Sequence, residues 1–326
     1  MAHGLRWEVP AGWESPLRLP ELRELHVHTI AFVTTFRPSA AVALAAKTNP
    51  AAVVLVLAKP EHRQRVAQLG AVWADVDANA SSVRRFASMY RQSVGGSPAY
   101  WRFCHSRWLL LAAHLRVRPP PRDGAVVVLD DDVLLFERVE QRLRGLAAQK
   151  PQAHVDTAIN GAFLLASAPA LQRFAAFLWA LYALPAADLV DVAWQFGNPA
   201  QLSALPSRLR SRIDPVMIRN GRYPVFTDMD SMNAFRLLSR RKELPENLRV
   251  RWSTGFRRGD CLQVNRVAQG SAVWNGSVMW LDGMPHHGLD IQKAQPYCYF
   301  HLQGPAAKDV LMRPMLLAAG LEPTML

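Results

Sequence analysis

Cysteine is scarce in this chain. Only Cys104, Cys261 and Cys298 occur among 326 residues, they lie far apart, and none has the CxxC spacing of a metal site. This pattern excludes a cysteine zinc site and a framework in which every cysteine is paired within the chain. A reducing compartment is the simplest expectation from such cysteine usage.

Long hydrophobic runs are also missing. The most apolar stretch, 174–184, is shorter than the roughly 18 residues needed to cross a bilayer. Trp7, Glu8, Trp13 and Glu14 interrupt the first 20 residues, which argues against a signal peptide. We therefore expect no transmembrane segment in this chain and a cytoplasmic location, with the Golgi or secretory lumen as the alternative if an anchor was removed.

Acidic residues are outnumbered. The chain has 26 Asp plus Glu against 38 Lys plus Arg, for a formal net charge of +12. This charge suits a phosphate-bearing partner, although abundant arginine and alanine would also follow from GC-rich coding DNA. The basic residues are dispersed and do not form the concentrated patch with interleaved aromatics that is typical of a nucleic-acid groove. We expect no nucleic-acid partner.

Strand and helix patterns alternate along the first half. Buried-strand patterns occur at 28–36, 51–58, 71–76 and 125–130, and helical patterns begin near Pro38 and cover 60–70 and 79–117. Continuous apolar strands are expected where helices cover both faces of a sheet. The sequence therefore predicts an α/β, Rossmann-like fold with a mostly parallel central sheet flanked by helices and an elaborated C-terminal half.

The second half is less regular. It has helical patterns at 137–149 and 168–184 and shows neither an internal repeat nor a clear linker. We therefore expect an N-terminal extension, residues 1–27, followed by a single domain, residues 28–326.

Three consecutive aspartates end the strand pattern at 125–130. Asp130, Asp131 and Asp132 follow a run of valine and leucine, and open α/β sheets bind ligands beyond the carboxyl ends of their strands. Adjacent carboxylates at such a place repel one another and lose solvation, so a compensating cation is expected, and hard oxygen ligands suit Mg²⁺ or Mn²⁺. The alternative is a solvated turn with a helix N-cap.

This pattern resembles the DxD motif of GT-A fold glycosyltransferases, in which an apolar strand ends at the diphosphate of the donor. The resemblance implies that Asp130 and Asp132 hold the metal and that Asp131 lies near the ribose or sugar of the donor. It also implies that residues 28–136 form the nucleotide-sugar half of the domain. Residues 137–326 would then form the acceptor half and the C-terminal metal and phosphate segment.

A C-terminal segment, 297–308, is similar to the His-x-x-Gly…Lys segment of several such enzymes. The similarity implies that His301 is the third metal ligand and that Lys308 contacts the diphosphate. An imidazole beside two carboxylates favours Mn²⁺ over Mg²⁺. The segment departs from the family form in that Lys308 follows Gly304 by four residues instead of three, and His301 could instead be a strand histidine packed among aromatic side chains.

The same resemblance suggests further donor contacts. Thr34 or Thr35, at the end of the first strand, would contact the base or ribose, unless the threonine only caps the strand. Arg102, in a Tyr-x-Arg pattern, would contact the donor from a helix that otherwise reads as an amphipathic core helix. Asn160 and Gly161 would form a turn that contacts the donor sugar or the acceptor.

The segment 226–232 resembles the one whose carboxylate faces the acceptor in related enzymes. It implies Asp228 as a general base, with Asp230 as the alternate. Both aspartates are equally candidates for the N-cap of a helix at 231–239.

The function predicted on this basis is metal-dependent transfer of a hexose or pentose from a nucleotide-diphosphate sugar to a hydroxyl of a carbohydrate, protein or small-molecule acceptor. One alternative is a phosphatase of the haloacid-dehalogenase type with Asp130 as nucleophile, but these proteins usually have Thr or Val where Leu134 stands. The other is a basic module for nucleic acid or anionic membrane, marked by steep salt dependence without a metal requirement.

Overall fold

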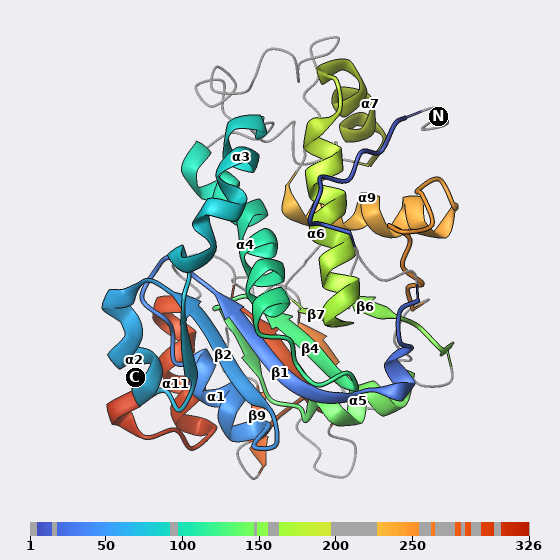
Figure 1. Ribbon diagram of the computed structural model, residues 1–326. Coiled ribbons are helices and arrows are strands. Elements are labelled where there is room, and N and C mark those ends of the chain that lie inside the picture. Colours follow the sequence, from blue (N-terminus) through green and yellow to red (C-terminus); the bar gives the residue numbers. More distant parts are fainter. Residues whose placement is uncertain are drawn as a thin grey trace.

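The chain folds around a central sheet covered by helices on both faces (Figure 1). The computed structural model of the protein describes residues 5–14, 18–91, 97–146, 149–155, 163–196, 227–253, 262–264, 278–281, 284–287, 295–302 and 308–325.

Six strands form the central sheet, in the order β3-β2-β1-β4-β7-β6. The strands β1, β2, β3 and β4 pair in parallel, whereas β7 is antiparallel to both β4 and β6. The strand bounds are β1 His26–Val33, β2 Val53–Ala58, β3 Val72–Asp75, β4 Gly124–Leu129, β6 Ala153–Val155 and β7 Phe163–Ser167. The predicted α/β fold with a mostly parallel central sheet is confirmed.

A second sheet pairs β5, the strand that follows β4, with strands from the C-terminal part of the chain. Its strands follow the order β5-β11-β10-β9, and β8 pairs with β11. The bounds are β5 Val133–Leu135, β8 Leu262–Val264, β9 Val278–Leu281, β10 Met284–His287 and β11 Gln295–His301. Cys298 in β11 is disulfide-bonded, and Cys104 is a free, buried thiol.

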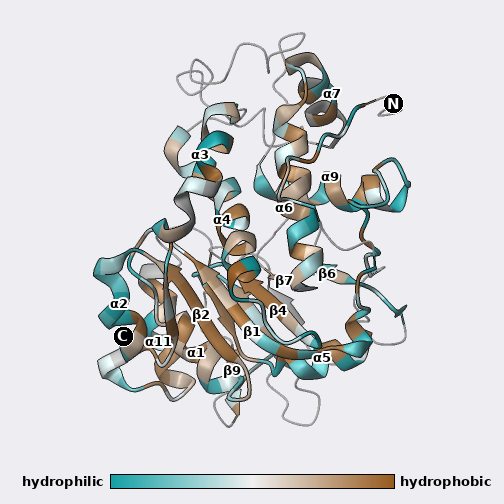
Figure 2. Cartoon of the chain, in the orientation of Figure 1, coloured by the Kyte–Doolittle hydropathy of each residue, from teal (hydrophilic) through white to brown (hydrophobic). Residues whose placement is uncertain are grey.

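Both faces of the central sheet are buried, which explains why its strands are continuously apolar. Side chains that alternate along one strand enter two separate cores. One core takes Ala31, Val33, Val126, Val128, Leu164 and Ala166. The other takes Ile30, Phe32, Val127, Leu129, Phe163 and Leu165. In Figure 2 the strands β1, β2 and β4 are accordingly predominantly brown.

Each core is closed by its own set of helices. The first core packs against α3 Ala80–Met89, α4 Pro98–Val117, α6 Ala168–Ala183, α7 Ala186–Phe196 and α9 Asp228–Arg240. The second packs against α1 Ala41–Thr48, α2 Arg63–Gln68, α5 Val139–Leu146 and α11 Arg313–Ala318. Among the described helices, none combines the length and apolar character that a membrane span requires.

The helical pattern over 79–117 corresponds to two helices, α3 and α4. Ser97 caps α4, because its side chain accepts a hydrogen bond from the backbone N–H of Tyr100, and Pro98 occupies the first turn. A proline there has a backbone angle already suited to a helix and lacks an N–H that would be unpaired anyway. The sequence therefore starts a new helix at Pro98 rather than continuing α3.

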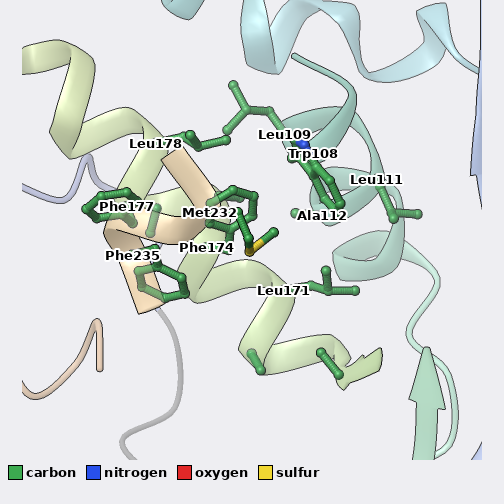
Figure 3. Close-up of a cluster of buried hydrophobic side chains, with 14 of the residues drawn as sticks. Trp108, Leu109, Leu111, Ala112, Leu171, Phe174, Phe177, Leu178, Met232 and Phe235 are labelled. Atoms are coloured by element: carbon green, nitrogen blue, oxygen red, sulfur yellow. The ribbon is translucent and has the colours of Figure 1, made fainter. Parts of the chain in front are cut away.

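Aromatic packing joins α4, α6 and α9 (Figure 3). The ring of Phe235 in α9 lies 5.5 Å from Phe174 and 5.0 Å from Phe177 of α6, and Trp108 of α4 lies 5.3 Å from Phe174. This cluster fixes α9, which carries Asp228, on the face of the sheet that α4 and α6 cover.

The N-terminal segment 5–14 lies along α6 (Figure 1). Trp7 contacts Phe177 at a ring distance of 5.5 Å, and the buried Trp13 contacts Trp179 at 6.0 Å. This part of the predicted N-terminal extension therefore contributes to the first core.

Candidate active site

Strand pairing brings the histidine of the C-terminal segment to the aspartate turn. Val133, the first residue of β5, pairs with His301 in the antiparallel β5–β11 ladder, and the backbone N–H of Leu302 donates to the carbonyl of Asp132 at 3.0 Å. His301 Nε2 consequently lies 3.3 Å from Asp132 Oδ1 and 4.0 Å from Asp130 Oδ2. One ligand atom from each of these three residues lies within 4.8 Å of the others.

The three aspartates form a tight turn between β4 and β5. The backbone N–H of Val133 donates to the carbonyl of Asp130 at 3.1 Å. A turn was the alternative to a metal site, but the side chains of Asp130 and Asp132 are only 14% and 13% exposed. The aspartates therefore do not form a freely solvated turn, and the element that follows them is the strand β5 rather than a helix.

Asp131 links this turn to the end of β1. Thr34 Oγ1 donates to Asp131 Oδ2 at 3.2 Å, and Ser39 Oγ donates to the backbone carbonyl of Asp131. Thr34 is buried, whereas its neighbour Thr35 is half-buried. The structure thus places Thr34 beside the acidic turn, where it holds the carboxylate of Asp131, which is not part of the group formed by Asp130, Asp132 and His301.

Arg107 is a functional candidate that the sequence reasoning missed. Its guanidinium donates to Asp130 Oδ1 through Nη1 and to Asp228 Oδ2 through Nη2, the latter at 2.8 Å. Trp108 Nε1 also donates to Asp228 Oδ2, at 3.1 Å. Arg107 therefore connects the first aspartate of the turn to the first residue of α9.

Helix periodicity explains why Arg107 rather than Arg102 reaches the site. Tyr100, Phe103, Cys104 and Arg107 all line one cavity, and their spacing of three and four residues puts them on one face of α4. Arg102 is exposed and is not among the residues that line this cavity. The i, i+3, i+4, i+7 pattern was readable in the sequence and would have indicated Arg107.

Charge and burial act against each other in this cluster. Burial raises the pKa of Asp130, the nearby Asp132 raises it further, and the Arg107 guanidinium opposes the rise. Burial by itself lowers the pKa of Arg107, but the carboxylates of Asp130 and Asp228 raise it well above the ordinary value. Arg107 is accordingly a permanent cation beside crowded carboxylates.

A cavity of about 380 Å³ opens beside the acidic turn. It is lined by Val33, Thr34, Phe36, Arg37, Ser39, Tyr100, Phe103, Cys104, Arg107, Asp130, Asp131, Asp132 and Met312. Phe36 and Tyr100 are 61% and 48% exposed, so both present aromatic surface to solvent at this site. The cavity lies at the carboxyl ends of β1 and β4, where open α/β sheets bind ligands.

Three of the remaining predicted residues lie wholly or partly outside what the structure describes. Lys308 begins the π-helical turn Lys308–Met312, and Met312 at its end lines the cavity, but the side chain of Lys308 lies outside what the structure describes. Asn160 and Gly161 lie outside the described residues. The contacts proposed for these three residues stay predictions.

Neither aspartate of the 226–232 segment is the N-cap of α9. Thr227 has that position, and it forms a capping box with Asp230, whose carboxylate accepts from the Thr227 N–H at 2.9 Å. Asp228 is 2% exposed and accepts from Arg107 and Trp108. The helix begins three residues earlier than the predicted 231–239 and holds Asp228 against α4.

Asp230 gives the fold a pH-dependent contribution. Burial raises the pKa of Asp230 to about 6 from an ordinary value of 3.8, although its bonds to Thr227 oppose the rise. The folded state then keeps this proton to higher pH than the unfolded state, so the contribution of Asp230 to stability falls as pH rises from about 4 to about 6. Over that range we expect Asp230→Asn to become progressively more stable relative to the wild type, measured by urea unfolding at each pH.

The control for this prediction is Asp77→Asn, since Asp77 is exposed and lies outside the capping box. If the two variants show the same dependence on pH relative to the wild type, the role assigned to Asp230 is wrong.

Comparison with known proteins gives distant structural likenesses and no sequence match. No protein-family model matches the sequence, and no curated protein matches it either. The apo crystal structure of mouse xyloside xylosyltransferase 1 superposes with a TM-score of 0.43 and 10% identity, covering 74% of this chain and 88% of that one.

Two further solved structures show the same kind of likeness. An active-site mutant of LgtC gives a TM-score of 0.38 and 13% identity over 90% of this chain and 95% of that one. The glycosyltransferase GlyE of Streptococcus pneumoniae TIGR4 gives 0.27 and 12% over 44% and 34%. At these scores and identities the likenesses are distant, and the function of this chain is inferred from its own site.

Proposed function

We propose that this protein is a glycosyltransferase that moves a sugar from a nucleotide-diphosphate sugar to an acceptor hydroxyl, with a divalent metal held by Asp130, Asp132 and His301. The observation that carries the proposal is the convergence of these three side chains, from the turn after β4 and from β11, within 4.8 Å at the edge of a cavity. The acidic turn and the histidine come from separate parts of the sequence that both resemble GT-A glycosyltransferases.

The residues present fit a divalent cation. Two carboxylate oxygens and one imidazole nitrogen form a donor set suited to Mn²⁺, with Mg²⁺ as the alternative. A metal at this place would neutralise the negative charge that develops on the leaving nucleoside diphosphate. The crowded carboxylates, whose mutual repulsion contributes to the raised pKa of Asp130, would gain stabilisation from the same cation.

The other cavity residues have the chemistry to bind and orient a nucleotide sugar. Phe36 and Tyr100 offer aromatic surface to a flat base or a sugar ring. Arg107 supplies a fixed positive charge, and Arg37 is an exposed second one at the lining. A cavity of about 380 Å³ is within the usual range for a small-molecule site.

A general base needs an open oxygen within reach of the acceptor hydroxyl. In this structure Asp228 Oδ2 accepts two hydrogen bonds and Asp230 is engaged in the capping box. The assignment of the general base to Asp228 or Asp230 therefore stays a prediction. We propose that the main role of Asp228 is to accept a hydrogen bond from Arg107.

The test is ligand-dependent stabilisation. We expect one class of nucleotide-diphosphate sugar to raise the unfolding temperature in Mn²⁺ but not in chelator, since a ligand at about 100 times its Kd adds about 2.7 kcal/mol to stability. Thermal unfolding would be followed across a panel of donors, with release of nucleoside diphosphate as the activity readout.

The matched control is the nucleoside monophosphate of the same base, which lacks the second phosphate for the metal and should stabilise the protein much less. A panel in which no nucleotide-diphosphate sugar stabilises the protein under any metal condition would overturn the proposed function. Steep salt dependence of binding to an anionic polymer, without a metal requirement, would then favour a basic binding module.

A further inference from the structure

The two carboxylate oxygens of Asp130 face different partners. Oδ1 accepts from Arg107 Nη1, whereas Oδ2 points toward the histidine and lies 4.0 Å from His301 Nε2. Only Oδ2 therefore faces the point between Asp132 and His301 where the metal proposed above would lie. The two oxygens of Asp130 therefore have different roles: Oδ1 is bonded to Arg107, and Oδ2 is the one available to the proposed metal.

The guanidinium that holds Oδ1 is itself held firmly. Its second terminal nitrogen donates to Asp228 Oδ2 at 2.8 Å, and its central carbon lies 5.0 Å from the ring of Trp108. Asp228 is fixed in turn by the Trp108 indole and by its place in the first turn of α9. The side chains of Arg107 and Asp228 are only 13% and 3% exposed, so water competes little for these bonds.

Metal ions differ in how they use a carboxylate. Ca²⁺ takes six to eight oxygen ligands and readily accepts both oxygens of one carboxylate, whereas smaller ions such as Mg²⁺ prefer six ligands near octahedral geometry. A carboxylate oxygen that is held by a fixed guanidinium is less available to a metal than the other oxygen of the same carboxylate. Such a site disfavours Ca²⁺ relative to a smaller ion.

We propose that Arg107 is a positioning residue that sets the metal selectivity of the site, because it holds Asp130 Oδ1 and leaves Oδ2 as the oxygen that faces His301. This inference rests on the proposed function, since it requires the metal at Asp130, Asp132 and His301. Asp228 serves in it as the anchor that keeps the planar guanidinium between the two carboxylates.

The experiment compares Mn²⁺ and Ca²⁺ affinity of the full chain without nucleotide, by calorimetry and by electron paramagnetic resonance of free Mn²⁺. Loss of a cation strengthens the binding of both divalent ions by a similar factor, so the ratio of the two affinities isolates coordination geometry from charge. In Arg107→Gln we expect the preference for Mn²⁺ over Ca²⁺ to fall, by up to the roughly 10- to 100-fold change in affinity that removal of a partner of a metal ligand usually causes.

Arg107→Lys separates geometry from charge further, since lysine keeps the positive charge but lacks the fork that joins two carboxylates. We expect it to lose most of the preference as well. Arg84→Gln, an exposed arginine of α3 outside the cavity, removes the same charge and should leave the ratio unchanged.

An unchanged ratio in Arg107→Gln, or a wild-type ratio in Arg107→Lys, overturns this inference while metal binding by the wild type still stands with the proposed function. A wild type that binds neither ion overturns both. If Arg107→Gln does not fold, Asp228→Asn replaces it, since the amide weakens the anchor of Arg107 while keeping its shape, and the expected shift has the same direction but is smaller.

Discussion

Asp132→Asn is expected to lower kcat/KM by at least about 1,000-fold, which corresponds to about 4 kcal/mol of the transition-state stabilisation that the proposed metal would supply. Asp132 Oδ1 lies 3.3 Å from His301 Nε2, so it is the carboxylate nearest to the imidazole in the candidate site. An amide keeps the shape of the side chain but is a much weaker metal ligand. The measurements are Mn²⁺ affinity by titration and the rate of nucleoside diphosphate release.

The matched control is Asp131→Asn, which removes the same charge from the same turn. Asp131 is outside the three-residue ligand group, and its carboxylate accepts from Thr34 instead. We expect Asp131→Asn to keep Mn²⁺ binding to within about one order of magnitude, a smaller loss than the roughly 10- to 100-fold that is usual for a partner of a metal ligand. Equal loss of Mn²⁺ affinity in both variants would contradict the assignment of ligands.

Unfolding of the metal-free protein tests whether misfolding explains this loss. Neutralising Asp132 relieves its repulsion of Asp130 but weakens its contact with His301 at 3.3 Å, so the two effects oppose each other. Without metal, Asp132→Asn should therefore unfold at a temperature close to that of the wild type.

Phe235→Ala is expected to reduce the free energy of unfolding by about 3–5 kcal/mol, the usual cost of truncating a fully buried phenylalanine. Phe235 is 0% exposed and contacts Phe174, Phe177 and Trp252 at ring distances of 5.5, 5.0 and 5.8 Å. Figure 3 shows it between α6 and α9. The measurement is urea unfolding, with an unchanged slope as evidence that the unfolded state is the same.

Phe235→Leu is the control, because it keeps an apolar side chain and leaves a smaller void. It should cost clearly less than the alanine variant. A loss below about 1 kcal/mol for Phe235→Ala, within the range of an ordinary surface change, would show that this aromatic cluster does not hold α9 in place.

Local sequence patterns predicted much of the fold and the two aspartates of the candidate site, Asp130 and Asp132. The apolar runs that became β1, β2 and β4 are continuous because both faces of the sheet are covered, and Asp130 to Asp132 mark where β4 stops. The role of His301 was predicted from resemblance to a short segment rather than from any local physical signal. The alternative interpretation, a histidine buried in a strand, also describes the position of His301, since His301 is 2% exposed and lies in β11.

What the sequence did not indicate depends on orientation and long-range pairing. The apolar residues of β7 are the same whichever way the strand runs, so its antiparallel pairing with β4 could not be read from them. The helical pattern did indicate that Arg107 shares a face of α4 with Tyr100 and Cys104, but it does not state what that face packs against. The partnership of Arg107 with Asp228 joins α4 to α9 and has no local signature at all.

The β5–β11 ladder has a consequence for the order of folding. The two aspartates come together with the turn after β4, but the imidazole joins them only when residues separated by about half of the chain close into one ladder. Closing so long a loop is entropically unfavourable and slow compared with forming local turns and helices. A nascent chain that has not yet formed β11 therefore lacks the third of the proposed metal ligands, and a metal bound there afterwards would stabilise the pairing of β5 with β11.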